Sequence, residues 1–90
     1  MAHFMVIERF KGGDPVPVYR RLRDKGRGTP VGLEVVTSWV TDDLKACYQV
    51  MKGERPKLDQ WVALWQDVID FEVLPALTSA EAQTRLVPRL

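Results

Sequence analysis

Hydrophobic and polar residues are interleaved through the middle of the chain in a pattern that predicts a β-hairpin. Residues 33–41 and 44–51 carry the β-branched, aromatic and other apolar side chains that fit a half-buried strand. Between them, Thr41, Asp42 and Asp43 indicate a turn, because short polar side chains hydrogen-bond to their own backbone. Neither face of this hairpin is fully polar, so we expect both faces of the sheet to be covered.

The register of the hairpin decides which side chains share a face. An even-length loop centred on this turn pairs Trp39 with Ala46 and Ser38 with Cys47. An odd-length loop would turn one strand over, so the register stays open from the sequence. With the even register, one face carries Glu34, Val36, Ser38, Val40, Lys45, Cys47, Gln49 and Met51, and the other carries Val35, Thr37, Trp39, Ala46, Tyr48 and Val50.

The flanking segments predict further strands and helices. Residues 3–10 and 70–77 indicate strands, and residues 15–25 indicate a helix that starts after an Asp-Pro pair and ends at a glycine. Residues 57–69 show helical periodicity, and residues 79–86 follow a threonine–glutamate pair with capping-box spacing. The apolar stripe of the helix at 57–69 consists of Leu58, Trp61, Val62, Trp65, Val68 and Ile69.

The order of these elements predicts an α+β fold of the ferredoxin-like βαββαβ type with a short C-terminal helix. In that fold the sheet has four antiparallel strands, both crossover helices cover one face, and the last strand is an edge, which suits Pro75 because proline cannot donate to a ladder. The other face is too apolar for water. We therefore expect a homodimer through the uncovered face, with two sheets forming a barrel-like core.

Composition adds little to this expectation beyond exclusions. The 90 residues correspond to a single domain, of which residues 78–90 form the C-terminal helix and tail. The net charge of +1 and the lack of a recognition motif argue against nucleic acid, and the basic residues near 20–27 are interpreted as a solvated helix face. A single cysteine, no signal peptide and no apolar run of membrane-spanning length predict a cytoplasmic protein without a membrane partner.

Four stretches of the sequence resemble a known family. FMVIERFKGGDPVPVYRR, the Ser38-Trp39 pair, CYQVM and DFEVLPALTSAEA together are similar to a family of short bacterial proteins of unknown function in the dimeric α+β barrel, ferredoxin-like superfamily. Arg55 departs from the family pattern, which usually has an acidic residue before the proline. The resemblance implies the fold and the dimer. The superfamily includes oxygenases, isomerases and ligand-sensing domains, so it implies no single activity.

The sequence offers two weak candidates for acid–base chemistry, Glu8 and Tyr48. Glu8 lies in the middle of a predicted central strand, where a carboxylate is unfavourable unless it is paired or lines a pocket. Cys47 is interpreted as a buried, inert thiol, because His3 is the only histidine and lies near the start of the chain. One histidine and one cysteine are too few for a metal site, and no cofactor is expected.

Neutral polar groups among aromatic side chains predict a pocket for a small, mostly apolar ligand, either between the sheet and the helices or at the dimer interface. Three roles stay open: a module that binds such a molecule, a cofactor-independent oxygenase or isomerase using Glu8 or Tyr48, and a purely structural or regulatory dimerisation module. A buried Glu8 with a raised pKa in a cavity would favour the enzyme. The candidate ligand-binding residues are Ser38, Trp39, Cys47, Gln49, Trp61 and Trp65.

Overall fold

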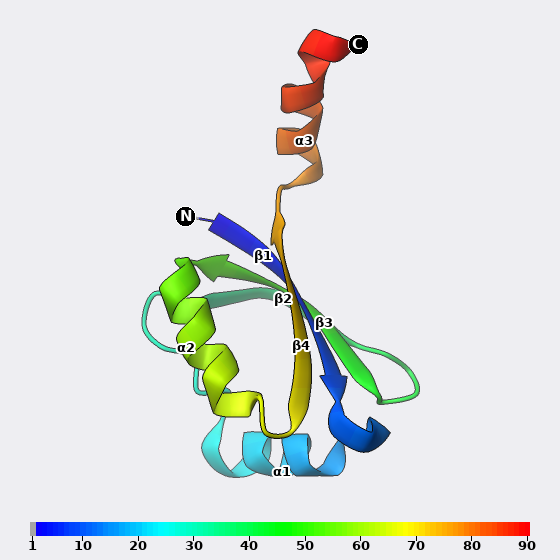
Figure 1. Cartoon of the computed structure of the whole chain (residues 1–90), viewed down its shortest axis with the longest axis vertical. Coiled ribbons are helices and arrows are strands. Elements are labelled where there is room, and N and C mark those ends of the chain that lie inside the picture. The colour runs from blue at the N-terminus through cyan, green and yellow to red at the C-terminus, as the bar shows by residue number, and fades with distance from the viewer. Residues whose placement is uncertain (1) are drawn as a thin grey trace.

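A computed structural model describes residues 2–90 as one four-stranded antiparallel sheet with helices packed against it (Figure 1). The strand order is β2-β3-β1-β4, so the ferredoxin-like α+β prediction is confirmed. The elements are β1 (Ala2–Phe10), η1 (Lys11–Gly13), α1 (Val16–Lys25), β2 (Glu34–Val40), β3 (Ala46–Gly53), α2 (Arg55–Trp65), β4 (Ile69–Ala76), α3 (Ser79–Leu86) and η2 (Val87–Arg89).

Local sequence signals explain several element boundaries. At the start of α1 the Asp14 carboxylate accepts a hydrogen bond from the backbone N–H of Val16, and at its end Gly26 adopts a positive φ of 72°. The capping box predicted for the C-terminal helix is present, with Thr78 and Glu81 bonding each other's backbone N–H groups. Pro75 lies in β4 at the edge of the sheet, as predicted.

The pairing predicted for the hairpin is wrong by two residues. Trp39 lies opposite Tyr48, and Ser38 lies opposite Gln49. The turn is centred one residue later than predicted, because Leu44 adopts a left-handed φ of 63° and Thr41 bonds to Ala46 through its backbone N–H. Since side chains alternate with a period of two, this shift leaves Ser38 on the same face as its predicted neighbours.

A bulge in β2 changes the face of its first residues. Val35 lies opposite Met51 and Thr37 opposite Val50, so Val36 is an extra residue without a partner. As a result Val35 packs against the core, and Val36 is 47% exposed. The predicted faces of Val35, Val36 and Glu34 are therefore wrong.

The second crossover helix is shorter than its apolar stripe predicts. It ends at Trp65, where the chain turns through a hydrogen bond from Val68 N–H to the Trp65 carbonyl. Ile69, predicted as the last helical residue, begins β4 and is 2% exposed. Strand pairing with β1 thus takes precedence over the continued helical period.

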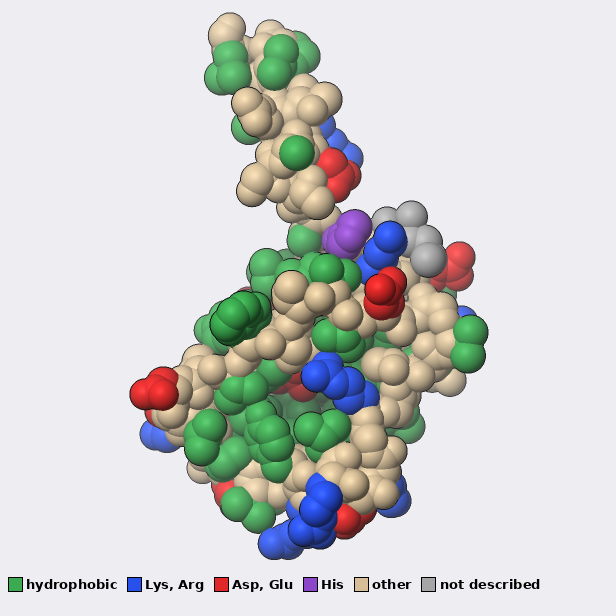
Figure 2. All heavy atoms as spheres, turned by 180° about the vertical axis from the view of Figure 1, so that it is seen from behind, with side chains coloured by type: hydrophobic (Ala, Val, Ile, Leu, Met, Phe, Trp, Pro, Cys, Tyr) green, Lys and Arg blue, Asp and Glu red, His purple; other side chains and the backbone are tan. Residues whose placement is uncertain are grey.

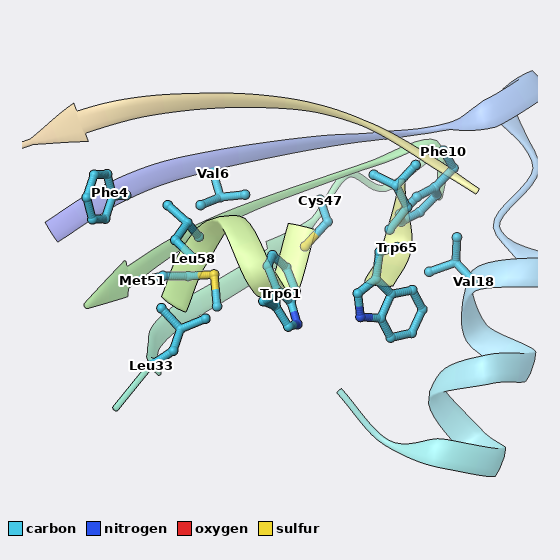
Figure 3. Close-up of a cluster of buried hydrophobic side chains, with 11 residues drawn as sticks. Phe4, Val6, Phe10, Val18, Leu33, Cys47, Met51, Leu58, Trp61 and Trp65 are labelled. Carbon is cyan, nitrogen blue, oxygen red and sulfur yellow. The ribbon is translucent and has the colours of Figure 1, made fainter. Parts of the chain in front are cut away.

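The core lies on one face of the sheet, under α1 and α2 (Figure 3). Val18 of α1 and Leu58, Trp61 and Trp65 of α2 are buried against it. The strands and the loop before β2 contribute Phe4, Val6, Phe10, Leu33, Cys47, Met51 and Ile69 to the same cluster.

In the part of the chain that is described, no helix is long and apolar enough to cross a membrane.

The opposite face of the sheet, called here the open face, has no helix of residues 2–90 packed on it. Its members alternate with the core residues along each strand. Beyond the sheet, α3 projects away from the end of β4 (Figure 1) and contributes no buried residue. The large apolar residues of the open face include Met5, Ile7, Trp39, Tyr48, Val50 and Leu74.

Candidate functional site

A cavity of about 240 Å³ lies between the inner face of the sheet, the two crossover helices and the loop after α1. The space-filling view shows a hollow with an acidic side chain at its floor and a basic side chain beside it, surrounded by apolar groups (Figure 2). The lining contains one acid and one base. Its residues are Glu8, Phe10, Val18, Tyr19, Leu22, Arg27, Ser38, Val40, Cys47, Gln49, Trp61, Trp65 and Ile69.

Glu8 forms the acidic floor of the pocket. It lies between Val6 and Phe10 on the inner side of β1, so strand alternation directs its side chain under the helices. The residue is only 5% exposed, and one carboxyl oxygen accepts a hydrogen bond from the Gln49 amide, itself 4% exposed. Burial raises the pKa of Glu8, and hydrogen bonds from Cys47 and Gln49 oppose that rise only partly.

Cys47 and Ser38 continue the polar floor across β3 and β2. The thiol and the hydroxyl lie 3.4 Å apart and hydrogen-bond to each other. Burial raises the pKa of Cys47 to about 11, and the nearby charge of Glu8 adds to the rise. A thiol with this pKa stays protonated at neutral pH, so Cys47 is a polar wall of the pocket and a poor nucleophile.

The loop after α1 is fixed to the pocket through the backbone of Arg27. Its carbonyl oxygen accepts hydrogen bonds from Nε1 of both Trp61 and Trp65, each 2.9 Å long. Figure 3 shows that the indole nitrogen of each tryptophan lies on the side of its ring that faces the other tryptophan. Both buried indole N–H groups are thereby satisfied, and the loop is anchored over the aromatic wall.

The structure brings most of the predicted site residues together. Ser38, Cys47, Gln49, Trp61 and Trp65 line the same cavity as Glu8. The other two candidates are directed to the open face: Trp39 is 73% exposed and Tyr48 is 41% exposed, and neither lines the cavity. The hairpin register explains this division. Trp39 and Tyr48 are paired with each other, and along each strand they alternate with the pocket residues, so their side chains point to the other face.

Sequence reasoning missed Arg27 and Tyr19 as parts of the site. Arg27 was assigned to a solvated basic patch, although it stands between Gly26 and Gly28, a pattern that marks a loop able to turn back over the fold. Tyr19 lies within the helix predicted at residues 15–25 and is not among the candidate site residues named from the sequence. Burial raises the pKa of Tyr19, with further contributions from Cys47 and Glu8, so its phenol stays protonated at neutral pH.

Chemically, the cavity combines an apolar aromatic wall with a short polar row. Within residues 2–90, no group of three histidine, cysteine, aspartate or glutamate side chains comes together in the way a metal ion requires. The row from Ser38 through Cys47, Glu8 and Gln49 can donate and accept hydrogen bonds, and Glu8 can exchange a proton. The site is therefore suited to hold a small organic molecule by one polar end.

Comparisons with known proteins give a family and no activity. Neither a curated protein nor a solved structure matches the chain. A family model described as "Domain of unknown function (DUF3303)" matches residues 2–89, which is almost the whole chain. The chain therefore belongs to the DUF3303 family, a domain of unknown function.

Proposed function

We propose that the protein binds a small, largely apolar molecule with one polar end in the cavity between the sheet and the helices. The observation that carries this proposal is the cavity of about 240 Å³ with a buried, hydrogen-bonded Glu8–Gln49 pair at its floor. Ligand sites typically combine apolar walls with a few polar groups that fix orientation.

The aromatic wall supports a flat or branched apolar ligand body. Trp61 and Trp65 are 3% and 5% exposed, and hydrogen bonds to Arg27 hold both rings in place. Aromatic rings that are already held in place lose little side-chain freedom when a ligand binds. The wall is therefore preorganised before binding.

Tryptophan fluorescence offers a direct test of binding. The chain has three tryptophans, and Trp39 lies outside the cavity, so a W39F background leaves only the two pocket tryptophans as reporters. Phenylacetamide, phenylacetate and indole, titrated to millimolar concentration, are suitable probes. We expect at least one of them to quench the fluorescence and to raise the midpoint of thermal unfolding.

A matched pair of substitutions locates the bound probe. Val18→Phe adds a ring inside the cavity, whereas Val16→Phe adds the same ring at a position of α1 that is 50% exposed. We expect V18F to weaken probe binding at least about tenfold and V16F to leave it unchanged. Leu22→Phe, at a half-buried lining position, serves if V18F does not fold. Equal effects of the inner and outer substitutions, or no binding of any probe, would contradict the proposal.

A second candidate function is proton transfer by Glu8 without a cofactor. It is favoured by the raised pKa of this buried carboxyl inside a cavity, because a general base works best with a pKa near the operating pH. In such a step the carboxylate takes a proton from a C–H group next to a carbonyl and later returns one to the same carbon.

Hydrogen–deuterium exchange of an enolisable probe tests this second candidate. Phenylacetone in D2O loses its α-proton signals in the ¹H NMR spectrum when a base catalyses enolisation. We expect the wild-type protein and Tyr48→Phe to accelerate this loss and Glu8→Gln not to do so. Equal rates for wild type and E8Q would show that Glu8 is not a catalytic base for such a substrate.

A further inference from the structure

Among the described residues, Arg27 is the only cation that lines the cavity, and its guanidinium has unused hydrogen-bond donors. The side chain is exposed, and its sole hydrogen bond among residues 2–90 runs from Nη1 to the Gln49 Oε1 atom over 3.4 Å. That distance is at the long limit for such a bond. No carboxylate of the described residues lies within ion-pair distance of Arg27.

Arg21, the other arginine near this wall, is a useful comparison, because its guanidinium is already bonded to acceptors of the protein. It forms two hydrogen bonds with the Asp67 carboxylate, at 2.9 and 2.6 Å, and a third with the Leu64 carbonyl. Its guanidinium carbon also lies 5.3 Å from the centre of the Trp65 ring. Arg21 therefore stiffens the outer side of the wall, and Arg27 is left to face the cavity.

The backbone at Arg27 is held by hydrogen bonds, whereas its side chain has a single long one, to Gln49. The indole N–H groups of Trp61 and Trp65 hold its carbonyl oxygen, and Gly26 and Gly28 on either side both adopt a φ of 72°. A positively charged fork is thus anchored at the rim, within reach of the cavity that the two rings close. This is the arrangement in which arginine binds a planar carboxylate with two parallel hydrogen bonds.

From this arrangement, and given the proposed binding function, we infer that the natural ligand is a small organic carboxylate. Its apolar body lies against Trp61 and Trp65, and its carboxylate pairs with the Arg27 guanidinium beside Gln49. The cavity volume of about 240 Å³ limits the body to roughly the size of one or two rings.

The Glu8 carboxyl group lies on the floor of the same cavity. It is compatible with a bound ligand carboxylate only if Glu8 is neutral. The titratable and charged groups around Glu8 are Cys47 from β3, Tyr19 from α1 and Arg27 from the loop, whereas α2 presents its two tryptophans. Burial favours the protonated form of Glu8, and in that form the carboxylic acid can donate a hydrogen bond. A bound anion further favours that form, so carboxylate binding is coupled to proton uptake by Glu8.

Two isosteric probes test the charge preference. Phenylacetate and phenylacetamide have nearly the same shape and differ in charge. In the W39F background we expect the carboxylate to bind at least about tenfold more tightly than the amide, with an affinity that falls as the pH rises through the raised pKa of Glu8. Arg27→Gln should reduce the preference to nearly none while amide binding persists, and Arg27→Lys should keep part of it.

Two controls separate the ligand class from binding itself. Arg20→Gln removes an exposed arginine of α1 that does not line the cavity, so the preference should persist. Glu8→Gln should abolish the pH dependence of phenylacetate binding. If the amide binds as tightly as the carboxylate, or if the preference survives R27Q, the carboxylate inference is wrong and the binding function stands. If neither phenylacetate nor phenylacetamide binds, the carboxylate inference is wrong. If indole does not bind either, or if V18F leaves binding unchanged, the binding function fails as well.

Discussion

Glu8 is an ionisable side chain in a buried environment, with only 5% of its surface exposed. A glutamate in the middle of a central strand is unfavourable unless something compensates for its burial. Here Gln49 donates a hydrogen bond to it, and among residues 2–90 no buried side-chain polar atom lacks a partner. The compensation is incomplete for the charged form, because burial still raises the pKa. Glu8 therefore connects the stability of the fold to pH.

We expect Glu8→Gln to remove a loss of stability that the wild-type protein shows as the pH rises. The pKa of Glu8 is higher in the folded protein than the ordinary glutamate value of 4.5, which applies to the unfolded chain. Above that pH the folded state binds more protons than the unfolded chain, so the free energy of unfolding falls until the pH passes the folded pKa. The glutamine keeps the shape and an acceptor for the Gln49 amide, and it does not titrate.

Urea unfolding of both proteins from pH 4 to pH 9 measures this effect. The free-energy difference between E8Q and wild type should grow in favour of E8Q as the pH rises and then level off. The subtraction cancels every other titrating group that the two proteins share. A difference that is constant with pH would mean that Glu8 has the same pKa in both states.

At the scale of elements, the sequence predicted which strands and helices exist better than where they turn. Apolar alternation and the Asp-Pro and Gly signals were sufficient for the order of elements, which the structure confirms. The centre of the hairpin turn was missed because Leu44 adopts a left-handed conformation, which a leucine in the sequence does not predict. The bulge at Val36 was missed because a run of β-branched residues fits either face of a strand.

The candidate site shows the same division between what a pattern can and cannot indicate. Glu8 and Gln49 were found because a polar group on a core-facing position is conspicuous in a strand. Arg27 was missed because its backbone carbonyl, and not its charge, attaches it to Trp61 and Trp65. A hydrogen bond between an indole and a backbone carbonyl 34 residues away depends on the packed fold and leaves no periodic signal.

The end of β3 depends on a glycine for a close approach between two segments. A Cβ atom built on Gly53 would lie 2.6 Å from the carbonyl oxygen of Gly32 and 3.3 Å from the Cα atom of Leu33. Both neighbours are backbone atoms, so the chain entering β2 would have to move. We expect Gly53→Ala to lower the free energy of unfolding by about 3 kcal/mol, as overpacking of a tight site does.

Gly12→Ala is the matched control for this prediction. Gly12 has a positive φ of 67°, and a Cβ atom built there would meet nothing within 4 Å. Its substitution should therefore show only the strain of a left-handed backbone, about 1 kcal/mol. Denaturant unfolding compares the two variants directly. If G53A were no less stable than G12A, the close approach of the two backbone segments would not be limiting.

At the scale of the whole molecule, the sheet is unequally covered. The helices bury the inner face, whereas on the open face Trp39 is 73% exposed, Leu74 46% and Tyr48 41%. The projecting helix α3 adds to this imbalance, since an isolated helix of eight residues is too short to be stable by itself in water. Apolar groups gathered on one surface are typical of an interface between proteins.

We propose that a second copy of the chain covers the open face. The strands of this face carry both acidic and basic side chains around the apolar centre, with Arg9 near Glu72 and Glu34 opposite Lys52. Such a mixed surface can match itself across a two-fold axis, because each acidic group can meet a basic group of the copy. A dimer through this face leaves the cavity accessible, since the cavity lies on the other side of the sheet.

The matched substitutions Leu74→Lys and Leu64→Lys test this assembly. Leu74 lies on the open face and is 46% exposed, and Leu64 lies on α2 and is 53% exposed. The two leucines are therefore similarly exposed but lie on different surfaces. We expect sedimentation to give twice the chain mass of 10.3 kDa for wild type and L64K at micromolar concentration. L74K should weaken association at least about tenfold, because a lysine buried in the interface would have to give up its hydration without a prepared partner for its charge. A monomeric wild type, or equal association of L64K and L74K, would exclude the open face as the dimer interface.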